Sequence, residues 1–181
     1  MTYCKKIYDE SQMVAGVNSI ADNIIAHFPA GSDLAIVGIQ QMGVVLAEKI
    51  CAELAGRGRE VDFGKVDITM HRDDIGSRNL LPMIRETEIN FDVNGKDIIL
   101  VDDVLSTGRT IRAALDALTD YGRPGLIRLA VLVDRGEPEF PIRADFAAFN
   151  ISLPAERKVV VRFDAGADGE AGIFDVNWNQ N

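Results

Sequence analysis

The chain has 181 residues and a net charge of −9 at neutral pH, with 47% hydrophobic and 26% charged residues. These values predict a single domain spanning residues 1–181, with enough chain for a core that needs no disulfide or metal. No apolar run is long enough to span a membrane. The negative net charge disfavours most nucleic-acid binders, which carry a basic surface.

The first third of the chain predicts a helix, a strand and a second helix. No apolar signal core precedes them, which favours a cytoplasmic protein. Apolar residues recur at helical spacing over residues 11–28, and Pro29 ends that pattern. Residues 34–39 form an apolar run typical of a strand buried on both faces, and residues 44–54 form the next helix. The turn between them either binds an anion or simply joins the two elements; it contains Gln40, Gln41, Met42 and Gly43.

A strand over residues 60–70 and a long polar connection over residues 71–92 come next. Loops of that length are usually functional lids or disordered segments.

Residues 97–118 have the most informative pattern in the chain. The apolar run 98–101 predicts a buried strand, Asp102 and Asp103 follow it, and apolar residues at helical spacing resume at Ile111. The turn between the acids and the helix is small and hydroxylic, with Ser106, Thr107, Gly108, Arg109 and Thr110.

Each part of this pattern has a chemical use. A turn that opens a helix presents backbone N–H groups to a phosphate, and a glycine lets the backbone approach it closely. The two acids would repel a phosphate, but they suit a group rich in hydroxyls, such as a ribose, or a hydrated Mg²⁺. A phosphate site next to a diol site describes a ribose 5-phosphate.

The last third predicts strands over residues 126–133, 144–149, 158–163 and 172–176. Buried strands that alternate with helices predict an α/β fold with a central, mostly parallel sheet flanked by helices. Its binding crevice would lie at the carboxyl ends of the strands, where residues 40–43, 102–110 and 134–136 can meet.

Residues 98–110 resemble the phosphoribosyl pyrophosphate (PRPP) motif of the type I phosphoribosyltransferases: an apolar strand, two acids, two apolar residues and a hydroxyl-and-glycine phosphate loop. Beyond that motif, the chain resembles the pyrimidine operon attenuation proteins that are also uracil phosphoribosyltransferases. The stretches that carry this second resemblance are 66–74, 101–118, 122–124, 129–136 and 141–146.

The resemblance implies an enzyme that joins uracil to the phosphoribosyl group of PRPP, giving UMP and pyrophosphate. Asp102 and Asp103 would be catalytic and would bind the ribose, and residues 106–110 would hold the 5-phosphate. Mg²⁺ would arrive with PRPP and have no direct protein ligand. The pyrophosphate would meet Gln40, Gln41, Met42, Gly43 and Arg72, and the base would meet Val133, Asp134 and Arg135.

The same resemblance implies three further properties. Residues 71–92 would form a flexible hood over PRPP, with Arg78 and Arg85 as additional candidates for contact with pyrophosphate. The protein would form a homodimer or a larger homo-oligomer. Family members commonly have a cation in the pyrophosphate loop, where this chain has none, so we expect a raised KM for PRPP.

A second activity of the resembled family is UMP-responsive binding of a messenger-RNA stem-loop. This chain has Ser19, Asp22, Glu137 and Phe149 where RNA-binding members place basic residues. Three cations stay as candidates for RNA contact: Arg128, Arg143 and Lys158. We therefore expect the enzyme to be the main function. The alternatives are an RNA-binding attenuator with little enzyme activity and a phosphoribosyltransferase for another base.

Overall fold

The computed structural model describes residues 4–71, 86–165 and 169–177. The strands are β1 Cys4–Asp9, β2 Leu34–Ile39, β3 Asp62–Val66, β4 Asp97–Leu105, β5 Leu126–Asp134, β6 Phe146–Asn150, β7 Arg157–Arg162 and β8 Gly172–Asn177. The helices are α1 Glu10–His27, α2 Met42–Gly56, α3 Arg109–Thr119 and the short 3₁₀ helix η1 Thr69–His71.

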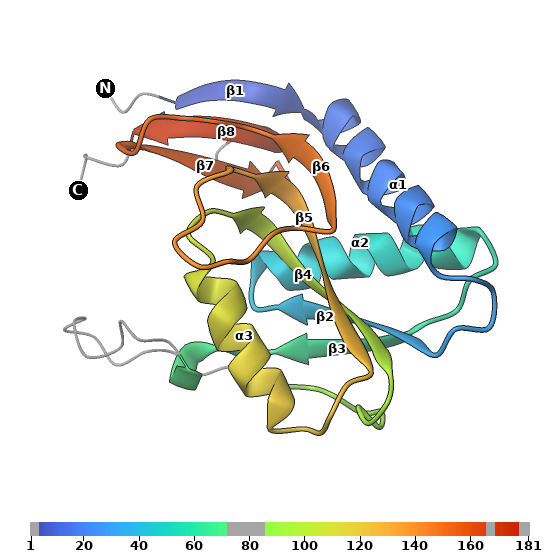
Figure 1. Cartoon of the computed structure of the whole chain (residues 1–181). Coiled ribbons are helices and arrows are strands. Elements are labelled where there is room, and N and C mark those ends of the chain that lie inside the picture. Colours follow the sequence, from blue (N-terminus) through green and yellow to red (C-terminus); the bar gives the residue numbers. More distant parts are fainter. Residues whose placement is uncertain (1–3, 72–85, 166–168, 178–181) are drawn as a thin grey trace.

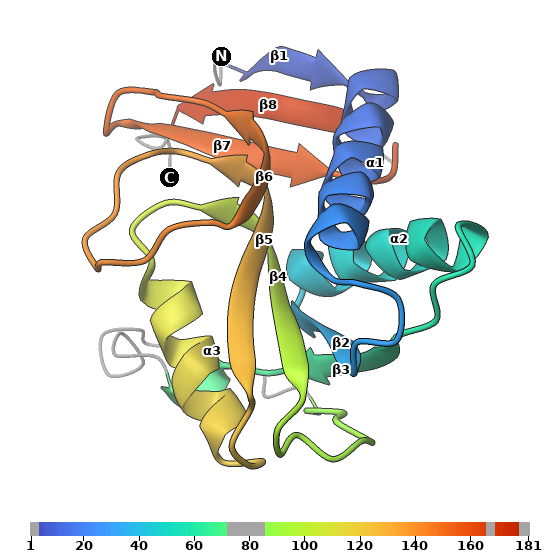
Figure 2. The same ribbon diagram turned by 45° about the vertical axis from the view of Figure 1, so that its right-hand side comes forward.

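The central layer is a five-stranded parallel sheet in the order β3-β2-β4-β5-β6. Helices α1 and α2 cover one face and α3 covers the other (Figure 2). Every residue of β2 is buried, with Leu34 and Ile36 packed toward α1 and α2 and with Ala35 and Val37 on the face of α3. The predicted parallel sheet between helices is therefore confirmed, and its strands are apolar because both faces are covered.

Helix α1 begins and ends where the sequence predicts. Asp9 caps it: its carboxylate accepts a hydrogen bond from the Gln12 backbone N–H, and the Gln12 side chain accepts one from the Asp9 backbone N–H. The helix ends one residue before Phe28, whose N–H still bonds to the Ile24 carbonyl. Within the described residues, no helix is long and apolar enough to cross a membrane.

Two predicted strands have different lengths in the structure. The strand predicted over residues 60–70 ends at Val66, because the Asp67 carboxylate accepts hydrogen bonds from the backbone and hydroxyl of Thr69 and turns the chain into η1. In contrast, β4 runs past the apolar run to Leu105, because its pairing with β5 continues through Asp102 and Val104. The two acids therefore lie within the strand and not after it.

Part of the predicted hood, residues 72–85, lies outside the described residues. The chain that follows it pairs with the edge of the sheet: Lys65 and Glu88 exchange two backbone hydrogen bonds, each of 2.9 Å. The strand predicted over residues 144–149 is β6, which is displaced toward the C-terminus and ends at Asn150.

A second sheet of three antiparallel strands, in the order β1-β8-β7, was not expected from the sequence. It lies beyond the carboxyl ends of β4 and β5 in both ribbon views (Figures 1 and 2). Its apolar residues Val159, Val161 and Ile173 join the core that α1 and α2 form with the parallel sheet. The small sheet thus closes the end of the molecule at which the sequence placed the crevice.

Candidate active site

Three stretches that are distant in sequence meet at the carboxyl ends of neighbouring strands. Residues 40–43 follow β2, residues 106–110 follow β4, and residues 135–136 follow β5, and these three strands are adjacent in the sheet. The parallel topology therefore brings the predicted pyrophosphate loop, the 5-phosphate loop and the predicted base-binding residues to one edge, as parallel sheets do.

Gly43 brings the first stretch into direct contact with β4, the strand that leads into the second stretch. A Cβ atom at this position would lie 2.5 Å from the Val101 carbonyl oxygen and 3.1 Å from the Asp102 Cα atom. The start of α2 can approach β4 this closely only because residue 43 has no side chain. The same approach covers Asp102, whose residue is only 7% exposed.

Asp102 and Asp103, here called the acid pair, are electrostatically unusual. Burial raises the pKa of Asp102 well above its ordinary value, and the neighbouring charge of Asp103 raises it further. Burial also raises the pKa of Asp103, while the nearby positive charge of Lys158 acts in the opposite direction. The Asp103 backbone N–H donates to Asp102 Oδ1 at 3.0 Å. Such a pair favours a ligand that brings hydroxyl donors or positive charge.

The donor set of the acid pair is compatible with Mg²⁺. In residues 4–71, 86–165 and 169–177, no three His, Cys, Asp or Glu side chains converge as a metal site. Two carboxylates can still contact a Mg²⁺ ion that keeps water or phosphate oxygens in its other positions.

The loop after β4 has the geometry of an anion site. Gly108 has a φ of +87° and is the N-terminal cap of α3; it has no side chain to cap the helix, and the Arg109 N–H donates weakly to Thr107 Oγ1 at 3.4 Å. The first N–H groups of the helix therefore face the loop, where they can bind a phosphate. The loop is held from outside, because the Thr107 carbonyl accepts hydrogen bonds from the backbone N–H groups of Glu139 and Phe140.

Arg109 lies at the start of α3 and contacts the segment after β5. Its Nε and Nη2 atoms lie 2.9 and 2.7 Å from the Glu139 carboxylate, and its guanidinium stacks on the Phe140 ring. A phosphate at this loop would compete with Glu139 for the same guanidinium.

The loop after β2 offers backbone groups and no cation. The Gln40 N–H bonds to the Val66 carbonyl at 3.0 Å, the Gln41 carbonyl accepts from Val44, and the Gln40–Gln41 peptide bond is cis. Met42 is 36% exposed at the start of α2. Arg72, the predicted cation of this subsite, and Arg78 and Arg85 lie outside the described residues.

The predicted base-binding residues are less exposed to the crevice than expected. Val133 is fully buried in the sheet, and the Asp134 carboxylate accepts a hydrogen bond from the Gly136 N–H at 2.8 Å. The Arg135 side chain is buried and is turned toward the segment that leads into β7. If these residues meet the base, the Arg135 guanidinium is not the group that does so.

Sequence reasoning missed two contributors to the crevice. Lys158 on β7 lies close enough to Asp103 to affect its pKa, and Glu139 pairs with Arg109. The sequence predicts a strand over residues 158–163 that includes Lys158, but only the packing of the second sheet against the first places its charge near the acid pair. Glu139 follows Pro138 in an irregular loop, where no periodic pattern predicts which way a side chain points.

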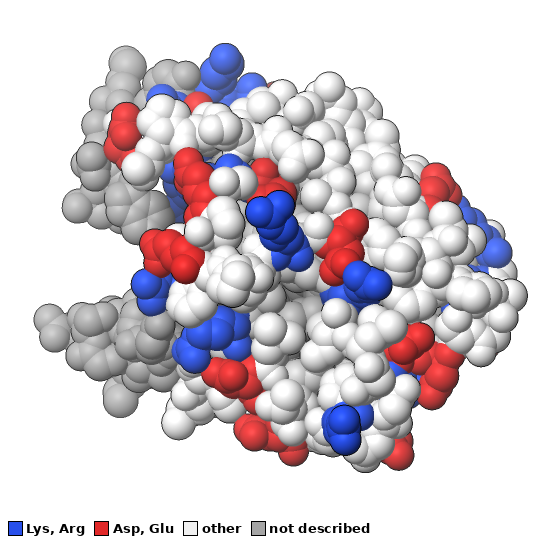
Figure 3. All heavy atoms as spheres, in the orientation of Figure 1, with Lys and Arg blue, Asp and Glu red and all other residues white. Residues whose placement is uncertain are grey.

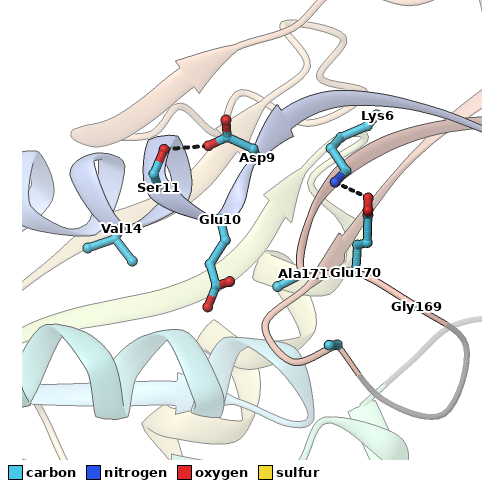
Figure 4. Close-up of a pocket in the computed structure, with 9 residues that line it drawn as sticks. Lys6, Asp9, Glu10, Ser11, Val14, Gly169, Glu170 and Ala171 are labelled. Atoms are coloured by element: carbon cyan, nitrogen blue, oxygen red, sulfur yellow. Dashed lines mark hydrogen bonds and ion pairs between the residues drawn. The ribbon is translucent and has the colours of Figure 1, made fainter.

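A cavity of about 660 Å³ lies elsewhere, between the junction of β1 with α1 and the segment 169–171 (Figure 4). Lys6 there pairs with Glu170, and Asp9 accepts from Ser11 and Gln12 as the helix cap. None of the predicted site residues lines it.

Nearly the whole chain is similar to known phosphoribosyltransferases. The model of the phosphoribosyl transferase domain matches residues 4–161. The bifunctional protein PyrR of Roseiflexus sp. (strain RS-1) is 46% identical over 173 residues, covering 95% of this chain and 94% of that protein. The bifunctional protein PyrR of Ligilactobacillus salivarius (strain UCC118) is 47% identical over 172 residues, covering 93% of this chain and 96% of that protein.

Solved structures show the same fold at low identity. A mutant hypoxanthine phosphoribosyltransferase from Trypanosoma cruzi, in a ternary complex with substrates, gives a TM-score of 0.73 at 16% identity, covering 96% of this chain and 95% of that chain. A hypoxanthine-guanine phosphoribosyltransferase from Bacillus anthracis gives 0.69 at 17% identity, covering 95% and 96%. The predicted type I phosphoribosyltransferase fold is therefore confirmed.

Proposed function

The chain belongs to the phosphoribosyltransferase family and, within it, to the PyrR proteins, and on that basis we propose that it is a uracil phosphoribosyltransferase. In the proposed reaction, N1 of uracil loses its proton to the departing pyrophosphate or to water and bonds to C1 of the PRPP ribose as the bond from C1 to pyrophosphate breaks, giving UMP and pyrophosphate. The observation that carries the proposal is the contact of Gly43 with β4, which brings a backbone-rich loop against the buried acid pair.

The residues have distinct roles in this proposal. The acid pair accepts hydrogen bonds from the ribose hydroxyls and lies near the positive charge that develops at C1 as pyrophosphate departs. The loop 106–110 holds the 5-phosphate through the N–H groups at the start of α3, and residues 40–43 hold the pyrophosphate. Mg²⁺ bound to PRPP would supply positive charge to the departing pyrophosphate. No covalent nucleophile is required, because catalysis rests on positioning and electrostatics.

The choice of base rests on the relatives and on one residue. The proteins that align at 45–47% identity are PyrR proteins, whereas the hypoxanthine enzymes align at 16–17% and bear only on the fold. Ser106 stands where some purine-using relatives of the resembled superfamily carry an acid, and a hydroxyl is a poor general base. Both points favour a pyrimidine.

A pyrophosphate-release assay tests the proposal. Purified protein with PRPP and Mg²⁺ would be given uracil, hypoxanthine, guanine or orotate in parallel reactions. We expect release with uracil to exceed release with the other bases by at least about 100-fold in kcat/KM, as a site built to hydrogen-bond one base discriminates. Activity with a purine in place of uracil would contradict the assignment of the base.

The second candidate function is UMP-responsive binding of a pyrimidine-leader RNA, which the name "bifunctional" of the relatives favours. In the structure, Arg128 is paired with Asp145 at 2.6 Å, and Lys158 lies near Asp103. Lys and Arg are interspersed with Asp and Glu on the face shown in Figure 3. We therefore place the enzyme first.

A further inference from the structure

Arg135 is a buried arginine that directly follows the carboxyl end of β5. Its guanidinium contacts two backbone carbonyls and one carboxylate. The residue is 8% exposed. Nη1 donates to the Arg157 carbonyl at 3.0 Å, and Nη2 donates to the Leu153 carbonyl at 3.3 Å. Nη2 also lies 3.1 Å from the Glu137 carboxylate. The planar guanidinium therefore fixes two backbone carbonyls with one side chain, which a lysine cannot reproduce.

These contacts join three walls of the crevice. Leu153 and Arg157 belong to the segment that enters β7, and Glu137 belongs to the segment that follows β5. The Arg135 backbone N–H donates to the Leu105 carbonyl at 2.9 Å, next to the first residue of the 5-phosphate loop. A single residue thus connects the end of β4, the end of β5 and the start of β7.

The start of β7 is the wall that a base would meet. Lys158, the residue after Arg157, lies near Asp103, and β7 lies beyond the carboxyl ends of β4 and β5 in both ribbon views (Figures 1 and 2). If the acid pair holds the ribose hydroxyls, a base attached to the same ribose extends past the acid pair toward this wall. The position of the wall then determines how well the base fits.

We propose that Arg135 is a positioning residue for the base subsite, acting through the Leu153 and Arg157 carbonyls and not through contact with the base. This inference rests on the proposed uracil phosphoribosyltransferase activity. It assigns base affinity to a residue whose two Nη atoms already have protein partners. A displacement of the wall of about 1 Å is enough to reduce rate or affinity strongly.

The test compares Arg135→Lys with Arg128→Lys in the full-length protein. Both arginines lie on or next to β5, but Arg128 is near its opposite end, paired with Asp145. KM for uracil, KM for PRPP, kcat and Tm would be measured for both variants and for the wild type. We expect Arg135→Lys to raise KM for uracil by about 10-fold and KM for PRPP by less than about 2-fold. Arg128→Lys should change neither KM.

The outcomes separate the inference from the proposed function. A wild-type protein without uracil-dependent pyrophosphate release would contradict the proposed function itself. An active wild type with equal rises in both KM values for Arg135→Lys, or with a lowered Tm and unchanged KM for uracil, would overturn the positioning role.

A milder variant keeps the test informative if Arg135→Lys does not fold. Glu137→Gln removes the half-exposed carboxylate beside Nη2 and leaves the guanidinium and both carbonyls in place. We expect a rise of about 2- to 4-fold in KM for uracil with KM for PRPP unchanged, since only one contact of the guanidinium is weakened. An unchanged KM for uracil in this variant would count against the inference.

Discussion

At the residue scale, the acid pair combines a functional position with a cost in stability. A carboxyl group whose pKa is raised in the folded protein favours folding at low pH, where it is protonated in both states. That contribution is lost as the pH rises through the folded-state pKa. Asp102 and Asp103 both have raised pKa values, mainly because they are buried, so ionisation of the acid pair destabilises the ligand-free protein at neutral pH and above.

Asp102→Asn should therefore stabilise the ligand-free protein, and more so at high pH. The ordinary pKa of the group is 3.8, so the difference in Tm between variant and wild type should be small near pH 4 and grow as the pH rises toward 8. A gain of about 1–2 kcal/mol corresponds to roughly 2–8 °C in a chain of this size. Thermal unfolding at several pH values checks this, with the exposed Asp116→Asn as control. If the difference in Tm between Asp102→Asn and the wild type did not change with pH, ionisation of Asp102 would not destabilise the folded protein.

The same residues should be needed for turnover. Asp102→Asn combined with Asp103→Asn removes the charge proposed to stabilise the positive centre at C1. We expect kcat with uracil to fall by at least about 100-fold, the size typical for a lost electrostatic contribution, while the protein stays folded. Circular dichroism alongside the pyrophosphate assay tests both points. Unchanged turnover would remove the acid pair from the proposed ribose site.

Gly108 allows the phosphate loop to be tested against a matched glycine. Gly108 and Gly31 have φ values of +87° and +88°, so Gly108→Val and Gly31→Val carry the same backbone strain of about 1–2 kcal/mol. Only the first adds side-chain bulk where backbone N–H groups face the predicted 5-phosphate. We expect Gly108→Val to weaken binding of PRPP and of UMP by at least about 10-fold, and Gly31→Val to weaken neither. Isothermal titration calorimetry of both variants measures this. Weaker binding of PRPP alone would reassign the loop to pyrophosphate.

At the element scale, local patterns were sufficient wherever an element is buried in a regular way. Strand β2 is apolar at each of its six positions, and α1 has a helical stripe and clear ends, so both were predicted closely. The extension of β4 through Asp102 and Val104 was not visible, because pairing with β5 maintains the strand and apolar periodicity does not. Strand β1 was missed because its residues are largely exposed or half-buried and its partner β8 is more than 160 residues away.

The candidate site shows the same division. The loops at 40–43 and 106–110 were found because each follows a buried strand, and parallel topology then requires that they meet. The packing of the second sheet over that edge depends on long-range contacts, which no short motif encodes. The position of Lys158 and the buried state of Arg135 both follow from that packing.

Docking of α1 on β6 depends on a glycine and can be tested as an element contact. A Cβ atom on Gly16 would lie 2.8 Å from the Phe149 ring, which also stacks on Tyr8 at 4.1 Å. We expect Gly16→Leu to lower the free energy of unfolding by about 1–3 kcal/mol through overpacking, and Ala15→Leu, on the exposed side of α1, to change it by less than about 0.5 kcal/mol. Chemical denaturation measures both variants. Repeating Gly16→Leu in a Phe149→Ala background should reduce its effect, and a fully additive result would place the strain elsewhere.

At the scale of the whole molecule, the distribution of charge determines the affinity of the chain for nucleic acid. The net charge is −9, and two of the three candidate cations have other roles in the structure, Arg128 with Asp145 and Lys158 near Asp103. Phe149, at a position where basic residues occur in RNA-binding members of the resembled family, packs against Gly16 and Tyr8. On the face shown in Figure 3, acidic and basic side chains alternate and form no continuous basic area.

We therefore expect weak RNA binding at near-physiological salt, even with UMP present and without preference for stem-loop sequence. A protein that neutralises several phosphates loses affinity steeply with salt, with a log–log slope of about −0.7 to −0.9 per phosphate. The opposing possibility is that a dimer gathers Arg128, Arg143 and Lys158 from two subunits into one basic concavity, since a local field can act within an acidic protein. Titration of a pyrimidine-leader stem-loop and a scrambled stem, each with and without UMP, at several salt concentrations distinguishes the two. Sub-micromolar, UMP-enhanced binding of the leader alone, with a slope that corresponds to several phosphates, would mean that the regulatory activity stands beside the enzyme in this chain.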